Sequence, residues 1–357
     1  MNSVRALRIA IDLDAIRHNL NVARQLSSGQ KCFAVLKADA YGHGAIRVAK
    51  ALADADAFAV VTVNEAIELR NATIDKPILV LQGAHTQPEC EAFIRHRLWP
   101  VIHCEEQLRW FSNLSDSSNL HPWLKVDTGM GRLGFLPHRA QALLRETHGL
   151  NWYGALTHFA LADEVDNATT AEQIQGFSSL DAPVSVQRSL ANSAGVLAWP
   201  DSVADWARPG IMLYGSNPIA GASATDVALR PAMQVSAPLI SCKLYAAGAT
   251  IGYGGAFVCP KPMKVGYLAI GYGDGFPRVL DRTATVWLAG QRCPIIGRIS
   301  MDSIAVDLTG IDKAQLGAEA VLWGGEHPVE LLAEAAGTIS YELLTSIKGQ
   351  REYNEPE

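Results

Sequence analysis

Short apolar runs alternate with amphipathic stretches over the first two thirds of the chain. The apolar runs predict eight strands, near residues 32–37, 57–63, 77–81, 99–103, 121–127, 153–159, 184–190 and 205–213. Helical spacing of apolar positions predicts helices over residues 13–27, 64–71, 88–97, 105–111, 137–148 and 168–180, the first with Asp14 as its cap. Eight strands alternating with helices are what a (β/α)8 barrel requires, whereas seven would favour an open doubly wound sheet. The run at 205–213 is the weakest strand prediction of the eight, so this strand decides between the barrel and the open sheet.

The pattern changes near Arg230. Alternating apolar and polar positions predict strands over residues 235–243, 264–270, 283–288, 293–296, 303–308 and 320–323. Ala289-Gly290-Gln291 predicts a hairpin turn between two of them, and helical spacing returns only around residues 331–336. We therefore expect an α/β protein of two domains. An N-terminal (β/α)8 TIM barrel covers residues 1–229, and a C-terminal, mostly β domain covers residues 230–357.

Composition and charge narrow the class of partner. The chain has 357 residues, of which 48% are hydrophobic and 18% charged, as in an ordinary soluble globular protein. A net charge of -6 and the lack of a Lys and Arg stripe argue against nucleic acid. No run approaches the roughly 18 apolar residues of a membrane span. Asp12 and Asp14 interrupt the apolar run behind Arg5 and Arg8, so no signal peptide is expected. A small molecule is the favoured partner.

Cysteine and histidine spacing gives no sign of a metal site. The six cysteines, at positions 32, 90, 104, 242, 259 and 293, show no close pairing, so neither a disulfide framework nor a zinc site is predicted. The ten histidines form no His-Glu-x-x-His pattern. We expect no metal, and the cytoplasm follows as the expected compartment.

Candidate chemistry begins where the first predicted barrel strand ends. Lys37 follows the apolar run at the carboxyl end of that strand, where the loops of parallel α/β folds form active sites. Taken alone, a lysine there is more often a solvated charge. The eight residues from Lys37 to Gly44, KADAYGHG, closely resemble the signature of alanine racemases. In that family this lysine carries pyridoxal phosphate as a Schiff base.

Further stretches in both halves of the chain resemble the same family, in matching order. They are KVDTGMGRLGF at 125–135, THFA at 157–160, NSAG at 192–195, RPGI at 208–211, IGYGG at 251–255, GYGDG at 271–275, GRISMD at 297–302 and SYELL at 340–344. Taken singly, such stretches are more often flexible turns or buried packing residues. Ser300 stands where some members have cysteine, and the tail after Ile347 follows the family only loosely.

The resemblance implies a pyridoxal phosphate site with two catalytic bases, Lys37 and Tyr253. The residues implied to bind the cofactor are Lys37, Tyr41, Arg132, His158, Asn192, Ser193, Arg208, Gly210, Ile211 and Tyr341, and those implied to bind substrate are Arg132 and Met301. Lys125 would neighbour Arg132, and it is carbamylated in some family members. Ser193, Gly210 and Ile211 also make a consistent phosphate cradle, because TIM barrels frequently bind phosphate at their seventh and eighth loops.

Two of these residues carry a chemical inference. An arginine has donors only and keeps its proton, so Arg208 can bond to the pyridine nitrogen only when that nitrogen is unprotonated. An unprotonated pyridine is a weaker electron sink than a pyridinium, and it therefore favours return of a proton to the same carbon over transamination. Racemisation also needs a second base facing Lys37, and the resemblance assigns that role to Tyr253, contributed by the other subunit of a homodimer.

The resemblance therefore implies interconversion of L-alanine and D-alanine by a two-base mechanism. The reaction would supply D-alanine for peptidoglycan or act in alanine catabolism. Two alternatives remain open. A pyridoxal phosphate decarboxylase of the same architecture would release carbon dioxide, although such an enzyme benefits from a stronger sink than Arg208 allows. A cofactor-binding carrier or regulator with a single barrel would need no second base, and Tyr253 argues against it.

Overall fold

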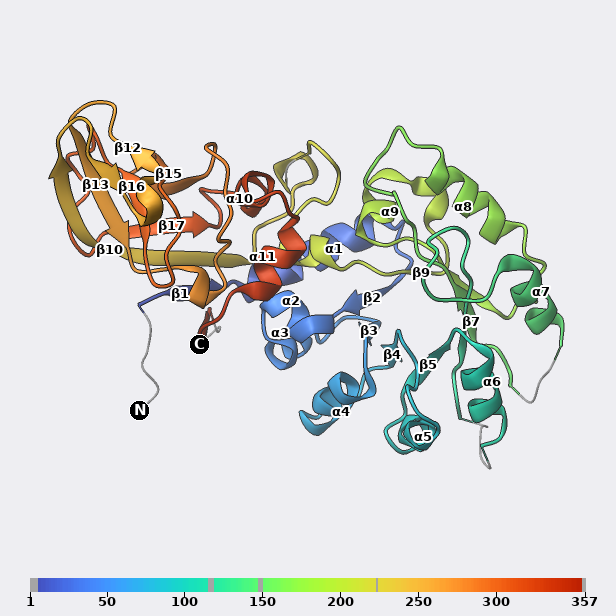
Figure 1. Ribbon diagram of the computed structural model, residues 1–357. Coiled ribbons are helices and arrows are strands. Elements are labelled where there is room, and N and C mark those ends of the chain that lie inside the picture. Colours follow the sequence, from blue (N-terminus) through green and yellow to red (C-terminus); the bar gives the residue numbers. More distant parts are fainter. Residues whose placement is uncertain (1–5, 115–118, 147–149, 223, 355–357) are drawn as a thin grey trace. The chain divides into compact units, whose positions relative to one another are not determined.

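The chain divides into two compact units in the computed structural model, which describes residues 6–114, 119–146, 150–222 and 224–354. The barrel unit comprises Ile16–Leu229, and the β unit comprises Met1–Ala15 together with Arg230–Glu357. The sequence-based division placed residues 1–15 with the barrel, whereas the described residues 6–15 group with the second half of the chain. Figure 1 shows the elements of each unit.

Eight parallel strands form the nearly closed barrel, with helices on their outer side (Figure 1). The hydrogen-bonded order is β8-β7-β6-β5-β4-β3-β2-β9. The strands are β2 (Lys31–Val35), β3 (Ala57–Val60), β4 (Ile78–Val80), β5 (Trp99–Ile102), β6 (Trp123–Lys125), β7 (Gly154–Leu156), β8 (Gln187–Ser189) and β9 (Trp206–Ala207). The predicted barrel is confirmed, because β9 pairs in parallel with β2 and supplies the eighth strand.

Six helices of the barrel unit follow the predicted amphipathic stretches, whereas α3 (Ala45–Ala51) and α9 (Ser193–Ala198) fall outside the helix ranges predicted above. The six are α1 (Leu13–Leu26), α4 (Val63–Asn71), α5 (Cys90–Arg95), α6 (Glu105–Ser112), α7 (Pro137–Arg145) and α8 (Thr169–Ser178). Part of the helix predicted to reach residue 148 lies outside the described residues. The prediction that Asp14 caps α1 is wrong. Asp12 lies immediately before the first helical residue, and its Oδ1 accepts from the N–H of Ala15 at 3.0 Å.

Aromatic side chains fill the barrel interior near the amino ends of the strands. Phe33 stacks on Trp206 with ring centroids 4.2 Å apart, and Trp123 meets Phe33 edge-on at 5.4 Å. Gly154 has to be a glycine here, because a Cβ would lie 2.6 Å from the Trp123 ring. Packing of this kind closes one end of the barrel, so the opposite end, at the strand carboxyl termini, is left for chemistry.

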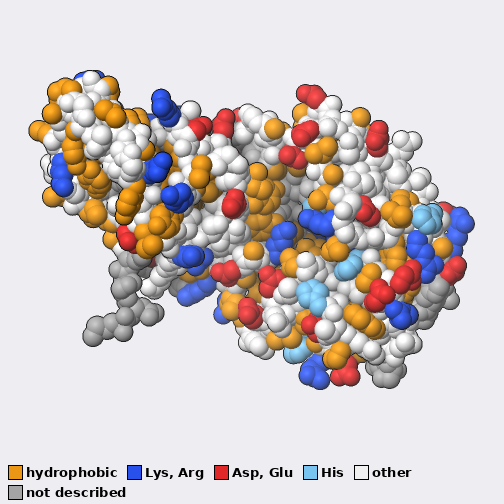
Figure 2. Space-filling view, viewed as in Figure 1, with side chains coloured by type: hydrophobic (Ala, Val, Ile, Leu, Met, Phe, Trp, Pro, Cys, Tyr) orange, Lys and Arg blue, Asp and Glu red, His pale blue; other side chains and the backbone are white. Residues whose placement is uncertain are grey.

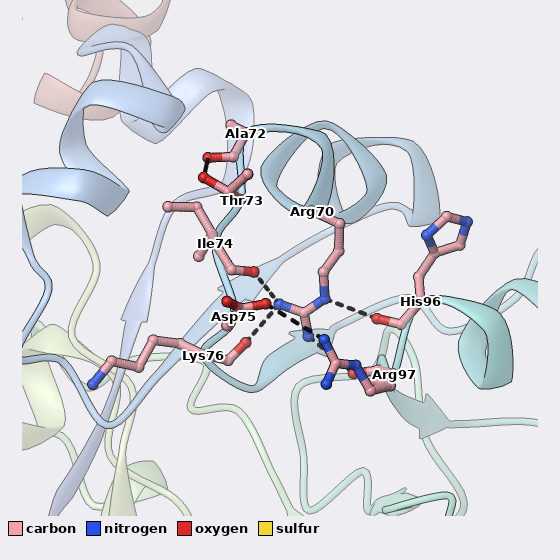
Figure 3. Close-up of polar contacts among 8 residues, drawn as sticks. All are labelled: Arg70, Ala72, Thr73, Ile74, Asp75, Lys76, His96 and Arg97. Carbon is pink, nitrogen blue, oxygen red and sulfur yellow. Dashed lines mark hydrogen bonds and ion pairs between the residues drawn. The ribbon is translucent and has the colours of Figure 1, made fainter.

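Arg70 ties together two connections at the same amino end (Figure 3). Its guanidinium donates to the carbonyls of Ile74 at 2.5 Å and Lys76 at 2.7 Å, in the connection between α4 and β4. It also donates to the carbonyls of His96 at 2.8 Å and Arg97 at 3.0 Å, between α5 and β5. These bonds satisfy loop carbonyls and stabilise the end of the barrel that carries no candidate site.

The β unit is built on a sheet in the order β13-β16-β15-β14-β17-β10-β1-β18. Its strands are β1 (Arg8–Ile11), β10 (Met233–Tyr245), β13 (Met263–Leu268), β14 (Thr285–Leu288), β15 (Gln291–Ile296), β16 (Ile304–Asp307), β17 (Glu319–Trp323) and β18 (Arg351–Tyr353), and β11 (Thr250–Ile251) pairs separately with β12 (Phe257–Val258). Two helices, α10 (Val329–Ala335) and α11 (Ser340–Ser346), follow β17. The predicted mostly β second half is confirmed.

Two details of the β unit bear on the sequence predictions. The hairpin between β14 and β15 turns on Ala289 and Gly290, whose positive φ angles of 55° and 85° are those of the hairpin turn that suits twisted strands. Within the loosely matching tail, Arg351–Tyr353 form β18, which runs parallel to β1 with Ile9 opposite Arg351. Within the described part of the chain, no helix is long and apolar enough to cross a membrane.

Candidate active site

Lys37 begins a left-handed turn at the carboxyl end of β2. The segment α2 (Lys37–Gly42) contains four successive non-glycine residues, 38–41, with φ between 52° and 54°. Such backbone costs about 1–2 kcal/mol per residue, so other contacts have to maintain it. The N–H of Ala38 donates to Glu65 Oε1 at 2.8 Å, and the N–H of Ala45 donates to Asp39 Oδ1 at 2.7 Å. The turn therefore has support at both ends.

The amine of Lys37 lies among other cations. Its Nζ stands 5.8 Å from the centroid of the Tyr41 ring. Burial lowers the pKa of Lys37, and the positive charges of Arg132 and Arg208 lower it further, while the Glu65 carboxylate opposes them. A lysine with a lowered pKa is neutral more often near physiological pH, so its nitrogen can act as a nucleophile or a base.

Lys125 places a fourth positive charge at this end of the barrel. Its side chain, the last of β6, is buried, with 8% of the residue exposed. Burial, together with Arg208, Arg132 and Lys37, lowers the pKa of Lys125 to about 8. Like charges gather in this way where a ligand of opposite charge compensates them. The site therefore suits an anion.

The loop after β6 has a fixed shape and carries Arg132. The Asp127 carboxylate accepts from the N–H groups of Gly129 and Gly131, each at 3.0 Å. Burial alone would raise the pKa of Asp127, but these backbone donors lower it overall, so the carboxylate stays charged. Gly134 has φ of +126°, and a Cβ there would lie 2.8 Å from the Asp127 nitrogen. The loop presents Arg132 on its exposed side.

Arg208 is buried at the end of β9, with 5% of the residue exposed. One terminal nitrogen donates to the carbonyl of Ser189 at 2.8 Å and to its hydroxyl at 2.6 Å, and the other donates to the carbonyls of Thr157 and Leu190. Burial lowers the pKa of Arg208 to about 10, so the group remains charged at neutral pH. All of these bonds use the terminal nitrogens, and the Nε–H can donate to a ligand.

His158 follows β7 and is held through its backbone. Gln173 of α8 donates to the carbonyl of His158 at 3.1 Å and accepts from the N–H of Ala160 at 2.9 Å. Burial first, then Arg208 and Lys125, lower the pKa of His158 well below its usual value. The imidazole is therefore neutral at physiological pH, as suits a ring that packs against a ligand.

Tyr41, Ser193 and Gly210 converge at the ends of three strands. The Ser193 hydroxyl accepts from the N–H of Gly210 at 2.8 Å, and Ile211 follows in the next turn of chain. A Cβ on Gly210 would lie 2.5 Å from the Tyr41 hydroxyl. Asn192 instead supports α9, because its side chain accepts from the N–H of Gly195 at 2.8 Å. Hydroxyls and backbone N–H groups together are typical phosphate ligands.

The β unit carries the remaining predicted residues, Tyr253, Met301 and Tyr341. Tyr253 stands in the turn between β11 and β12 and is 71% exposed, and Met301 is 52% exposed. Tyr341 lies on α11 and is partly buried. Figure 2 shows hydrophobic side chains interspersed with Lys and Arg on the visible face of this unit. The roles of these three residues remain predictions.

Two residues of the site escaped the sequence analysis, Glu65 and Gln173. Glu65 had a detectable signal, because Thr62-x-x-Glu65 is the pattern of a capping box and α4 begins with one. That pattern predicts a helix start but not the bond to Ala38, which joins two βα connections. Gln173 gave no signal, since a glutamine within an amphipathic helix is ordinarily exposed.

Comparison with known proteins gives consistent matches over nearly the whole chain. The family models described as alanine racemase, N-terminal domain, and alanine racemase, C-terminal domain, match residues 11–218 and 232–353. The chain is 44% identical to the alanine racemase of Aromatoleum aromaticum over 352 residues, covering 98% of this chain and 99% of that protein.

Solved structures agree with the sequence matches. The biosynthetic alanine racemase of Pseudomonas aeruginosa is similar with a TM-score of 0.93 at 41% identity, covering 99% of this chain and 100% of that chain. The alanine racemase of Bartonella henselae, solved with covalently bound pyridoxal phosphate, is similar with a TM-score of 0.88 at 30% identity, covering 98% and 99%.

Proposed function

The chain belongs to the alanine racemase family, and we propose that it interconverts L-alanine and D-alanine with pyridoxal phosphate as its cofactor. The observation that carries this proposal is the convergence of four cations at the strand carboxyl ends. The convergence is seen in the pKa values of Lys37, Lys125 and His158, each of which is lowered by burial and then by neighbouring cations from the set Lys37, Lys125, Arg132 and Arg208. An anionic cofactor and the carboxylate of an amino acid both fit such a site.

The residues present fit the cofactor's functional groups. The Lys37 amine suits its aldehyde, Arg132 its phenolic oxygen, and the Nε–H of Arg208 its ring nitrogen. Its phosphate suits the cradle of Tyr41, Ser193, Gly210 and Ile211, where the missing Cβ of Gly210 leaves room beside the Tyr41 hydroxyl. His158 would pack against the ring, and Asn192 supports the adjoining helix. We also propose Tyr341 as a cofactor-binding residue.

When bound, the cofactor supplies an electron sink that acidifies the α-proton of the amino acid. Lys37 would hold the cofactor and then exchange a proton with the α-carbon on one face. Its lowered pKa increases the fraction of neutral amine that can accept this proton. Arg132 would orient the substrate by its carboxylate, and we propose Met301 as a further substrate-binding residue. If Lys125 is carbamylated, it would present an anion to Arg132 in place of a cation.

Tyr253 would exchange the proton on the opposite face. We propose that it comes from the partner subunit of a homodimer. Its exposure in the turn between β11 and β12 supports this, because an exposed tyrosine is available to a second protomer. Other apolar side chains of the β unit are exposed as well, namely Ile240, Leu244, Val258 and Met301. Aromatic and methionine side chains are typical of such interfaces.

Arg208 would determine whether the α-proton returns to the α-carbon of the substrate. A ring nitrogen that accepts from a guanidinium carries no proton of its own, so the electron sink is weak. Return of the proton to the α-carbon is then favoured over its transfer elsewhere. This arrangement supports racemisation over decarboxylation, which benefits from a stronger sink. We further propose a cytoplasmic enzyme that supplies D-alanine or consumes alanine.

Chiral quantification of alanine tests the proposal. Purified protein is incubated with pyridoxal phosphate and either enantiomer, with Lys37→Ala as the control. We expect both reactions to converge on equal amounts of L-alanine and D-alanine, and the control to be inactive. Release of carbon dioxide would instead support the decarboxylase, and bound cofactor without any turnover would support a carrier.

A further inference from the structure

The carboxylate of Glu65 joins two neighbouring βα connections of the barrel. Its Oε2 accepts from the N–H groups of Val61 at 2.8 Å and Thr62 at 2.9 Å, which follow β3. Its Oε1 accepts from the N–H of Ala38 at 2.8 Å, which follows β2. One carboxylate thereby fixes the connection after β3 to the residue adjoining Lys37.

Capping of α4 does not account for both oxygens. Thr62 Oγ1 accepts from the N–H of Glu65 at 3.2 Å, and Oε2 returns the bond to the N–H of Thr62. These two bonds complete the capping box of α4. The bond from Ala38 to Oε1 lies outside the box and reaches 27 residues back along the chain. This bond therefore acts on the segment that begins at Lys37 and not on the start of α4.

The left-handed turn after Lys37 is strained, and the bond to Glu65 restrains it. Ala38 is the first of the four successive left-handed residues that turn the chain away from Lys37. A backbone of this kind persists only where its surroundings hold it. A charged acceptor makes a stronger hydrogen bond than a neutral one, so the Glu65 carboxylate is a strong restraint on the first residue of the turn.

Charge adds a second contribution. Among the charged groups that act on the Lys37 amine, Arg132 and Arg208 disfavour its protonated form, and Glu65 favours it. The neutral ring of Tyr41 lies near the same amine. Glu65 therefore moderates the effect of the cations around Lys37.

We propose that Glu65 is a positioning residue for Lys37. The Glu65 carboxylate holds the left-handed turn and supplies the negative charge that balances the cations around the Lys37 amine. This inference rests on the proposed function, in which Lys37 carries the cofactor and exchanges the α-proton. Glu65 itself touches neither cofactor nor substrate. Its effects reach the reaction through the placement and the protonation of Lys37.

The test compares Glu65→Gln with Thr62→Ala as a matched control. Thr62→Ala removes the side-chain cap of α4, together with the 3.4 Å bond from the Thr62 hydroxyl to Glu65 Oε2, and leaves the bond from the Ala38 N–H to Glu65 Oε1. It therefore reports the cost of weakening the helix start while the carboxylate still holds the turn. Labelling of Lys37 in the cofactor-free protein by trinitrobenzenesulfonate, followed by peptide mass spectrometry across pH, measures the pKa of Lys37. Release of pyridoxal phosphate from the loaded protein, followed by absorbance, measures how well the lysine is held.

We expect Glu65→Gln to move the labelling profile to lower pH and to raise the rate near pH 8 several-fold, up to about tenfold for one pKa unit. Cofactor release should accelerate by about tenfold, because a charged hydrogen bond is lost. Thr62→Ala should match the wild type in both measurements. Wild-type behaviour of Glu65→Gln in both measurements would overturn the inference.

If Glu65→Gln fails to fold, Glu65→Asp replaces it. The shorter side chain keeps the charge but loses reach, so cofactor release should accelerate while the labelling profile stays near that of the wild type. Release at the wild-type rate would overturn the inference. Failure of the proposed function is distinguishable, because wild-type protein would then leave alanine unracemised while the labelling profiles remain readable.

Discussion

The guanidinium of Arg208, at the end of β9, donates to the backbone carbonyl of Thr157, which directly follows β7 and precedes His158. The same terminal nitrogen donates to the carbonyl of Leu190 at 3.1 Å. One buried cation thus fixes the ends of three neighbouring strands. The residue that would set the electronics of the cofactor is also part of the framework of the barrel.

Arg208→Gln should therefore affect stability and reaction outcome together. The shorter amide leaves several buried carbonyls without a donor, and we expect the free energy of unfolding to fall by roughly 3 kcal/mol. Without the fixed cation, the ring nitrogen could be protonated, so pyruvate from transamination should increase relative to racemisation. Urea unfolding measures the first effect, and a lactate dehydrogenase assay for pyruvate measures the second. Unchanged product partition would remove Arg208 from its assigned position.

Tyr253→Phe should remove one of the two bases without harming the fold. The tyrosine is exposed, so we expect the free energy of unfolding to change by less than about 0.5 kcal/mol. Racemisation should fall by about 100-fold or more, the usual contribution of a positioned acid or base. The absorbance of bound cofactor should persist. A fully active variant would exclude Tyr253 as the base.

Mixing two inactive variants tests whether the site is shared between subunits. When Tyr253→Phe protomers are exchanged with Lys37→Ala protomers, a hybrid dimer contains one site with both bases intact. Activity should therefore recover after mixing, toward the level of one working site for each hybrid. Persistent inactivity, with exchange verified by native mass spectrometry, would show that both bases come from the same chain or that no shared site forms.

Gly210→Ala should weaken cofactor binding through Tyr41. The added Cβ would lie 2.5 Å from the Tyr41 hydroxyl, so that ring has to move out of the phosphate cradle. We expect the dissociation constant for pyridoxal phosphate to rise by about tenfold, which corresponds to about 1.4 kcal/mol. Gly176→Ala is the matched control, since its Cβ would meet nothing within 4 Å. Similar dissociation constants for the two variants would argue against the cradle.

Lys125 should make the stability of the cofactor-free protein depend on pH. Its pKa lies near 8 in the folded protein against 10.5 for an ordinary lysine, so the charged form costs about 3 kcal/mol at neutral pH. The unfolded chain binds more protons between these two values, so this cost is full below pH 8 and disappears as the pH rises through 10.5. Lys125→Met should therefore stabilise the protein at pH 7 and lose this advantage toward pH 10.5. Urea unfolding in buffer free of carbon dioxide measures both, and a difference independent of pH would contradict the assignment.

The sequence by itself determined the architecture of the barrel. The strands β2 to β7 and β9 coincide with apolar runs, because burial on both faces of a parallel strand demands one, whereas β8 reads Gln-Arg-Ser and lies within the predicted range 184–190 without being apolar itself. The position of Lys37 at the end of β2 follows from the same run. The residues of the predicted phosphate cradle could also be found locally, because Ser193 and Gly210 stand in the short connections after β8 and β9.

Contacts between distant residues decided the rest. β1 belongs to the β unit because it pairs with β10, more than 200 residues later, and no local pattern specifies such a partner. The left-handed turn at 38–41 contradicts the preference of every residue in it, and a sequence of alanine, aspartate and tyrosine predicts a right-handed helix there as readily. Only the folded barrel brings the carboxylate of Glu65 to the N–H of Ala38 and makes that turn stable. The chemistry at Lys37 was therefore visible in the sequence, while the geometry that presents the lysine depends on tertiary structure.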